Sequence, residues 1–321
     1  MKTKSGYLYL VILALAIVAP FFIESGYVMH TLIMASIYAI LTMGLNMITG
    51  FAGQLSLGHA AFFGVGAYTS ALLTIKLGLN FFLALSCSVG LAGIMGVILG
   101  FPALKLKGPY LVICTIGFVE IMHEIFLNWI GLTRGPMGIV DIPYPPTLTL
   151  GSWTIDFTVS LHYYFLVLVL TVITFVIIIS LVNSKMGRAL KAIREDEIAA
   201  ECSGVNITYY KLVAFSIGAA FAGIAGSLYA HYIGYISPDS FVLLESINIL
   251  VMLVLGGMGT MVGPIIGAVG VTFLLEYIRF LAEFKLIFYG IVLMLIMVVA
   301  PGGFWGFVER LSIPSLNGKD H

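Results

Sequence analysis

Long, uninterrupted stretches of apolar residues follow one another along nearly the whole chain. Because these runs are continuous and do not alternate with polar residues, they predict helices and not strands. A helix of roughly 20 apolar residues crosses the bilayer core, where only helices or closed barrels satisfy their backbone. We therefore expect an all-α polytopic membrane protein with about ten transmembrane helices. The runs are Tyr7–Ile23, Met29–Thr49, His59–Lys76, Asn80–Leu104, Pro109–Ile130, Val159–Val182, Lys211–Ile233, Phe241–Gly257, Met261–Phe280 and Lys285–Ala300.

Two of these predictions carry an alternative. The third run is a candidate for a partly re-entrant segment, and the eighth and ninth runs lie close enough to form one broken hairpin. The first run follows Lys2 and Lys4, as in a signal peptide. No small-residue cleavage site stands just after its apolar stretch, so we expect an uncleaved first helix.

The composition agrees with the pattern. Hydrophobic residues make up 60% of the 321 residues and charged residues 9%, whereas a typical soluble domain is about 25% charged. This balance excludes a soluble enzyme, a nucleic-acid-binding domain and a disordered chain. The net charge is zero and the chain has 3 cysteines, which are too few and too scattered for a disulfide or metal framework.

Basic residues predict how the chain is oriented in the membrane. With the amino terminus inside, 11 of the 15 Lys and Arg residues fall on the cytoplasmic side, which follows the positive-inside rule and places both termini in the cytoplasm. We expect one permease-like domain over residues 1–321. Within it, the Pro- and Gly-rich segment 131–158 lies outside and the charged segment 183–210 lies inside.

Two glycine-rich interruptions occupy comparable places in the two halves of the chain. The first glycine break, Gly50–His59, contains Gly53, Gln54, Ser56 and Gly58, and the second glycine break, Gly256–Pro264, contains Gly257 and Gly259. Paired interruptions in two pseudo-repeated halves are typical of a transport site between repeats. We expect these six residues near a translocation path, and the alternative is a pair of tight turns.

Several ionisable residues lie inside the apolar runs. They are Glu120, His123, Glu124, Glu245, Glu276 and Arg279. Such residues are functional candidates by default, but structural pairing or vestibule lining is favoured here over a proton relay. We interpret His59 as a satisfied polar anchor. No cluster has metal-ligand spacing and no nucleophile is paired with a base, so we predict no catalytic residue and no metal site.

The segment from Lys185 to Asn206 predicts a short helix that ends at Gly204. Ala189, Ile193 and Ala200 lie along one side, with charges of both signs elsewhere. A lipid-binding patch would be net basic, whereas mixed charge beside an apolar stripe favours a groove on a soluble partner. The alternative is a solvated connector.

Several separate blocks of the sequence carry a family resemblance. They are Gly187-Arg188, Ala192-Ile193-Arg194-Glu195-Asp196-Glu197, Ala199-Ala200 and Gly204-Val205 in the charged loop; Gly53-Gln54-Leu55-Ser56-Leu57-Gly58-His59-Ala60-Ala61-Phe62; Leu255-Gly256-Gly257-Met258-Gly259-Thr260; and Ala300-Pro301-Gly302-Gly303. Together they resemble the permease subunits of ABC importers for branched-chain amino acids, of the M-type (LivM-like). The sequence departs from the family pattern at His123, where arginine is usual, and at Thr133-Arg134-Gly135-Pro136, where Thr-Gly-Gly is usual.

The resemblance implies a transport subunit of the bacterial or archaeal cytoplasmic (inner) membrane that works by alternating access. Its implied partners are a second, homologous permease, two cytoplasmic ATPases and an external substrate-binding protein. The chain has no Gly-x-x-x-x-Gly-Lys-Ser/Thr loop, so we expect it to bind no cofactor and the ATPase subunits to use ATP-Mg.

The charged loop would then couple ATP hydrolysis to transport through Gly187, Arg188, Ala192, Ile193, Arg194, Glu195, Glu197, Ala200 and Gly204. A weakly polar path suits a zwitterion with an aliphatic side chain, although related permeases carry urea or short amides. The competing hypothesis is a secondary carrier or channel that is driven by an ion gradient.

Overall fold

The computed structural model describes residues 14–277, except 23–24, 105, 107 and 151–152. Within this part, seven helices are long and apolar enough to cross a membrane. They are Gly26–Phe51, His59–Leu77, Phe81–Ala103, Pro109–Asn128, Ser160–Asn183, Ile207–Ile233 and Pro238–Gly256, and a shorter apolar helix follows at Gly263–Tyr277. The fold is therefore that of an all-α, multi-pass membrane protein.

The predicted count of ten spans is only partly covered by the described residues. Of the first run, the structure describes residues 14–22, which include the short helix η1 (Ala19–Phe22). The tenth run, Lys285–Ala300, lies outside the described residues, as does the end of the ninth. The runs between them correspond to observed helices.

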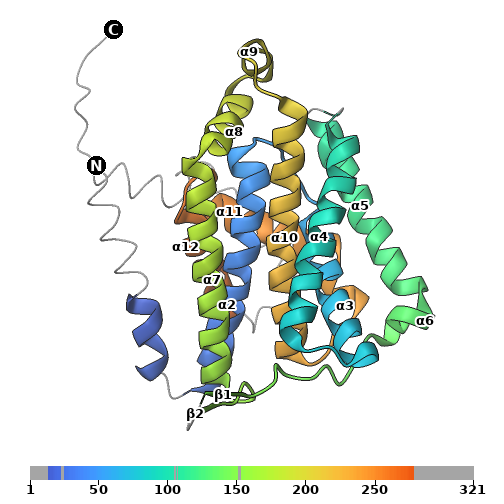
Figure 1. The fold of residues 1–321 in the computed structure, drawn as a ribbon, viewed down its shortest axis with the longest axis vertical. Helices are drawn as coiled ribbons and strands as arrows, with labels where there is room; N and C mark the ends of the chain where they lie inside the picture. The colour runs from blue at the N-terminus through green and yellow to red at the C-terminus, as the bar shows by residue number, and fades with distance from the viewer. Residues whose placement is uncertain (1–13, 23–24, 105, 107, 151–152, 278–321) are drawn as a thin grey trace.

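Helix α10 (Ile207–Ile233) packs against α2 (Gly26–Leu45), α3 (His59–Leu77) and α4 (Phe81–Ala103). Figure 1 shows it between α2 and α4. Glycines permit these close approaches. A Cβ at Gly96 of α4 would lie 2.6 Å from the carbonyl oxygen of Phe215, and one at Gly66 of α3 would lie 2.5 Å from the Cα of Gly223. Van der Waals contact between backbones thus takes the place of a hydrophobic driving force, which lipid cannot supply.

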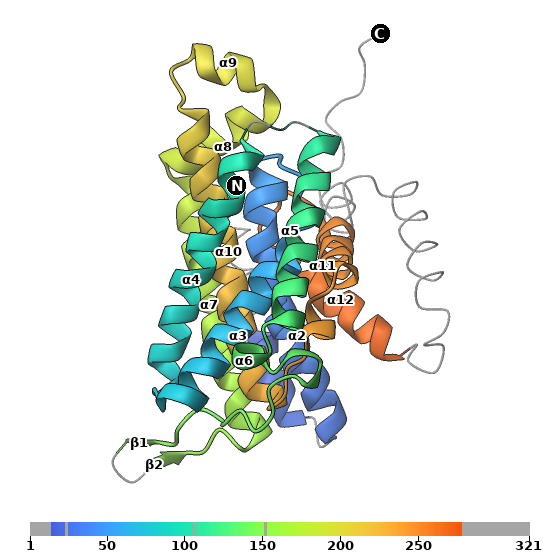
Figure 2. The same cartoon turned by 90° about the vertical axis from the view of Figure 1, so that its right-hand side faces the viewer.

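The two ends of the bundle differ. At one end, the α8 end, α7 (Ser160–Asn183) leads into α8 (Lys185–Glu195) and α9 (Glu197–Cys202). At the other end, the hairpin end, β1 (Leu148–Leu150) pairs antiparallel with β2 (Trp153–Ile155) (Figures 1 and 2). The sequence did not predict this hairpin, because strands of three residues carry almost no periodic signal.

The segment before the hairpin is also more ordered than the expected loop. After α5 (Pro109–Asn128), the chain forms α6 (Ile130–Thr133) and η3 (Gly135–Met137). It then pairs with the segment that follows α10, where the backbone of Ile139 exchanges hydrogen bonds of 2.8 and 3.0 Å with that of Ile236.

Both glycine breaks interrupt helices. Helix α2 passes into the π-helical segment η2 (Asn46–Phe51), and residues 52–58 then run without helical structure to the start of α3. Further along the chain, η4 (Pro238–Phe241) and α11 (Leu243–Gly256) are followed by a turn and by α12 (Gly263–Tyr277). The predicted broken hairpin is confirmed as far as Tyr277. The turn between α11 and α12 requires its glycines, because Gly257 and Gly259 both have positive φ.

The prediction of a single helix over the charged segment is wrong, because the segment forms two helices. The chain breaks at Asp196, whose extended backbone separates α8 from α9. The Asp196 carboxylate accepts hydrogen bonds from the backbone N–H groups of Ile198 (2.8 Å) and Ala199 (3.1 Å). An N-cap residue stabilises a new helix start by satisfying these otherwise unpaired donors.

Candidate functional site

The second glycine break is bonded to Asn46, which lies in η2 just before the first glycine break. This side chain is 1% exposed. Its Nδ2 donates to the carbonyl oxygen of Thr260 over 2.8 Å, and its Oδ1 accepts from the backbone N–H of Gly259 over 2.8 Å. Thr42, one turn earlier, donates to the carbonyl oxygen of Pro264 over 3.0 Å. The end of α2 is therefore bonded to the turn between α11 and α12.

Arg194, in the last turn of α8, lies over this junction. Its Nη1 donates to the carbonyl oxygen of Gly50 over 2.6 Å. A Cβ at Gly53 would lie 2.9 Å from the Cγ of Arg194, and a Cβ at Gly259 would overlap its guanidinium group. The charged segment therefore contacts both glycine breaks through one side chain.

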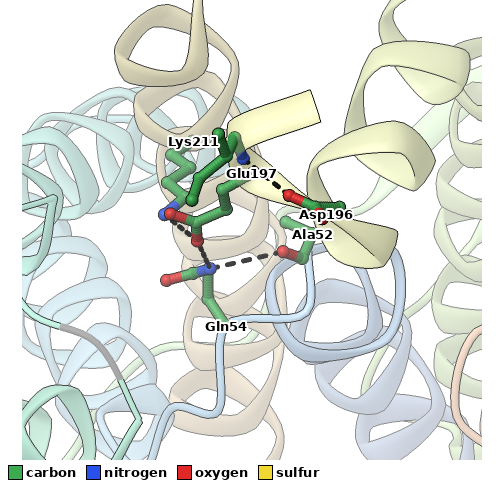
Figure 3. Close-up of polar contacts among 6 residues, drawn as sticks. Ala52, Gln54, Asp196, Glu197 and Lys211 are labelled. Carbon is green, nitrogen blue, oxygen red and sulfur yellow. Dashed lines mark hydrogen bonds and ion pairs between the residues drawn. The ribbon is translucent and has the colours of Figure 1, made fainter. Parts of the chain in front are cut away.

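Glu197 connects the same segment to the first glycine break and to α10 (Figure 3). The Nζ of Lys211 on α10 donates to the Oε1 of Glu197 over 2.5 Å, and the Nε2 of Gln54 donates to the same oxygen over 3.4 Å. The Lys211 side chain is 2% exposed and that of Glu197 is 23% exposed. A buried ammonium group needs such a partner, because desolvation of an unpaired charge costs several kcal/mol.

Two clefts open beside these residues. One, of about 620 Å³, lies between Gly53 to Leu55, the start of α5 and Glu197. The other, of about 340 Å³, lies between Ala52 to Gln54 and residues Ile193 to Ile198. Gln54 and Glu197, which are hydrogen-bonded to each other, line both clefts.

Of the six predicted path residues, the structure brings Gly53, Gln54 and Gly259 together around Arg194 and Glu197. Gly257 is buried in the turn beside them. Ser56 and Gly58 instead lie at the buried start of α3, where the Ser56 hydroxyl accepts from the Gly58 N–H over 3.2 Å.

Neighbouring helices supply further caps at the start of α3. Thr115 of α5 accepts from the backbone of Leu57 over 3.0 Å, and Ser246 of α11 accepts from that of Ala60 over 2.9 Å. The polar residues here satisfy the backbone and do not line either cleft near Arg194.

The apolar stripe predicted to enter a partner's groove is buried within this chain. Ala189, Ile193 and Ala200 are 8%, 2% and 4% exposed, because α8 and α9 lie against the ends of the membrane helices. The expectation that these three side chains face a partner is therefore wrong. The surface that remains consists of the charged positions of α8 and, on α9, of Ile198, Ala199, Glu201 and Cys202. Ile198 is 69% exposed.

The other predicted coupling residues divide in the same way. Arg188, Arg194 and Glu195 are exposed, whereas Gly187 is buried against the end of α7. Ala192 is half-buried, and Gly204 follows α9 with a positive φ of 82°. Segment 183–206 thus presents charges outward and small or apolar residues inward.

Most of the ionisable residues in the apolar runs have a nearby polar group. Asn248 donates to Glu245 over 3.0 Å, Tyr27 donates to Glu276 over 2.5 Å, and Asn128 donates to Glu124 over 2.6 Å. His123 lies 3.9 Å from Asp239. The preference for structural pairing or vestibule lining over a proton relay stays a prediction. Arg279 lies outside the described residues.

His59 is fully buried at the start of α3, with a side chain that is 0% exposed. The backbone of Leu41 lies beside the ring, but neither ring nitrogen makes a hydrogen bond of full geometry among the described residues. Its role as a satisfied polar anchor stays a prediction. In the described part of the chain, no three His, Cys, Asp or Glu side chains gather as a metal site.

Sequence reasoning missed two residues of this site. Neither Asn46 nor Lys211 was among the candidate site residues. An asparagine and a lysine inside long apolar runs were the available signal, since such groups are costly in a membrane unless they are paired.

Comparison with known proteins gives a consistent result. A family model described as "Branched-chain amino acid transport system / permease component" matches residues 27–300. The chain is 40% identical over 311 residues to the high-affinity branched-chain amino acid transport system permease protein LivM of Escherichia coli (strain K12), which covers 91% of this chain and 73% of the relative.

More distant relatives include both kinds of permease. The LivH permease of Escherichia coli (strain K12) is 27% identical over 300 residues, 86% of this chain and 93% of the relative. A probable LivM permease of Methanocaldococcus jannaschii is 26% identical over 315 residues, 83% of this chain and 90% of the relative. No solved structure matches the chain.

Proposed function

Because the chain belongs to the family of branched-chain amino acid transport permease components, we propose that it imports branched-chain amino acids by alternating access, powered by ATP hydrolysis in separate subunits. It is a membrane permease and not an enzyme. In this proposal the α8 end and both termini face the cytoplasm, and the hairpin end, with segment 131–158, faces the outside of the cytoplasmic membrane.

The observation that carries the proposal is the contact of α8 and α9 with both glycine breaks. Arg194 bonds to Gly50 and packs on Gly259, while Glu197 bonds to Gln54 and Lys211. A force that moves α8 and α9 therefore acts on the end of α2 and on the turn between α11 and α12. Both places are breaks in discontinuous helices, and transporters typically change conformation at such breaks.

We assign the ATPase contact to the exposed surface of α9, around Ile198. Ile198 is exposed on α9, and α9 lies at the α8 end of the bundle, opposite the β-hairpin (Figure 1). One exposed apolar side chain among charged neighbours fits an apolar pocket with a polar rim, which is the usual anatomy of a protein contact. The two ATPases would approach here and bind ATP-Mg themselves.

The remaining partners follow from the relatives. Since the chain resembles both LivM and LivH permeases, we propose that it pairs with a second permease of the LivH type. An external substrate-binding protein would deliver the amino acid at the hairpin end and provide most of the specificity. The residues around the larger cleft are mainly apolar or amide-bearing, which suits an aliphatic zwitterion.

The test uses the assembled transporter in proteoliposomes. Arg194→Ala should keep basal ATP hydrolysis but reduce leucine uptake at least about tenfold, because the contact with Gly50 and Gly259 is lost. Lys191→Ala, an exposed change on the same helix, is the matched control and should transport normally. Unchanged uptake per ATP in Arg194→Ala would overturn the proposed coupling.

A further inference from the structure

A chain of buried hydrogen bonds joins α3, α10 and the chain between η3 and β1 at the hairpin end of the bundle. The hydroxyl of Ser227 on α10 donates to the Oγ of Ser70 on α3 over 2.7 Å. That Oγ lies 2.8 Å from the Nε2 of His231 on α10. The other ring nitrogen of His231, Nδ1, lies 2.6 Å from the carbonyl oxygen of Pro143. All three side chains are 0% exposed.

The carbonyl group fixes the direction of each hydrogen bond in this chain. A carbonyl oxygen only accepts, so the Nδ1 of His231 carries a proton and donates to Pro143. The Nε2 then accepts from the hydroxyl of Ser70, whose oxygen in turn accepts from Ser227. Each polar group of the three side chains therefore has a partner. A buried polar network that is satisfied in this way holds its members in one arrangement.

The bond to Pro143 continues a backbone pairing. Besides the pairing of Ile139 with Ile236, the N–H of Ile142 donates to the carbonyl oxygen of Gly234 over 3.1 Å. Ile236 and Gly234 lie beyond the end of α10, whereas His231 lies in its last turn. His231 therefore attaches the 138–143 segment to the helix itself and not only to the loop that follows it.

The backbone of Asp141 indicates that the 138–143 segment is held firmly. Its φ of 58° lies in the left-handed region, which few residues other than glycine adopt. Such a conformation costs free energy and persists only where the surrounding structure determines the backbone. The hydrogen bonds of Ile139, Ile142 and Pro143 provide that constraint on both sides of Asp141. The 138–143 segment is thus fixed to the end of the bundle.

The opposite end of α10 carries the coupling contact. There Lys211 donates to Glu197 of α9. Helix α10 is one helix of 27 residues, and the 20 residues that separate Lys211 from His231 span about 30 Å. Helix α2 and helix α11, in contrast, end at the glycine breaks. A displacement of Lys211 by α9 is therefore carried along α10 to His231 without an intervening hinge.

We propose that His231 is a positioning residue for transport, which fixes the 138–143 segment to α10 so that this segment and the contact of Lys211 with Glu197 move as one body. The inference rests on the proposed function. Arrival of the substrate-loaded binding protein at the hairpin end then reaches the ATPases along α10. Movement of α9 on ATP binding reaches the hairpin end along the same helix.

The first experiment separates the two hydrogen bonds of the His231 ring. The amide of asparagine can donate from the place of Nδ1 to Pro143, whereas the longer amide of glutamine reaches Ser70 from the place of Nε2. In the assembled transporter, His231→Asn should keep the stimulation of ATP hydrolysis by leucine-loaded binding protein within about twofold of the wild type. His231→Gln should reduce that stimulation at least about tenfold and leave basal hydrolysis unchanged.

A matched control lies at the same end of α10. The Nδ1 of His30, a half-buried residue of α2, lies 2.9 Å from the hydroxyl of Tyr232 on α10 and not against the 138–143 segment. His30→Gln should therefore keep the stimulation. Equal stimulation in His231→Asn and His231→Gln would overturn the inference, because each variant loses one hydrogen bond of the ring. Absence of stimulation in the wild-type assembly would count against the proposed function instead.

The second experiment measures the distance along α10 directly. In the whole transporter, with its three cysteines replaced by serine, spin labels are attached at Val140→Cys and Tyr209→Cys, two exposed positions at opposite ends. Their distance should be the same without nucleotide and with ATP bound, and its distribution should broaden in His231→Gln. A change of about 5.4 Å, one helical turn, between the two states with His231 intact would overturn the inference. So would a distribution in His231→Gln as narrow as in the wild type.

Discussion

The ion pair between Lys211 and Glu197 makes a quantitative prediction. Lys211 is 2% exposed and Glu197 is 23% exposed, so Glu197→Gln leaves a buried ammonium group without its counter-charge. Removing one partner of a buried pair costs about 3–5 kcal/mol. Because the Glu197 carboxylate is partly solvated, we expect the lower end, about 3 kcal/mol.

The double variant separates charge from shape. In the variant that combines Lys211→Met and Glu197→Gln, no charge remains to be desolvated. We therefore expect its loss in free energy of unfolding to be about 2 kcal/mol smaller than the sum of the losses in the two single variants. The assay is thermal unfolding of the purified chain in detergent. At about 2 °C per kcal/mol for a large domain, Glu197→Gln should lower the melting temperature by about 5 °C or more.

A matched control lies on the same segment. Lys191→Met removes an exposed charge of α8 and should leave the melting temperature unchanged, because exposed charges contribute little to stability. The reasoning is refuted if Glu197→Gln melts like the wild type. It is also refuted if the double variant loses as much stability as the two single variants together.

Three further predictions address neighbouring contacts. Asn46→Ala removes both hydrogen bonds to the second glycine break and should destabilise the chain by about 2–3 kcal/mol in the same unfolding assay; no shift would show that the breaks are not held together there. Gly259→Ala places a side chain at a φ of 76° and against Arg194, so it should reduce uptake and stability, whereas Gly270→Ala, with open space around it, should not. Ile198→Asp should weaken co-purification of the ATPases without changing the melting temperature, since this side chain is exposed; unaltered ATPase binding would move the contact away from α9.

Periodicity and composition predicted the helices well because each membrane span must satisfy its own backbone, which makes the apolar run a local signal. The broken hairpin of α11 and α12 was predicted for the same reason, since Gly256 to Pro264 interrupts the run. The β-hairpin at 148–155 was not predicted, because such short strands depend on pairing that a single segment does not encode.

The site was predictable only in part. The glycine breaks and the charged segment could be recognised one at a time, but their contacts through Asn46 and Arg194 join parts of the chain that are distant in sequence. Ala189, Ile193 and Ala200 were expected to contact a partner, but they are buried within this chain. An amphipathic pattern says that one side of a helix is covered, and it does not say whether the cover is the chain itself or another protein.

The central claim is that this chain transports only as part of an ATP-driven assembly. Leucine accumulation in proteoliposomes tests it most directly, with the purified chain alone compared with the complete set of permeases, ATPases and binding protein. The account predicts that leucine accumulates only with the complete assembly, and only when ATP is present on the side of the membrane where the ATPases lie. Accumulation by the single chain, driven by an ion gradient and independent of ATP, would contradict it.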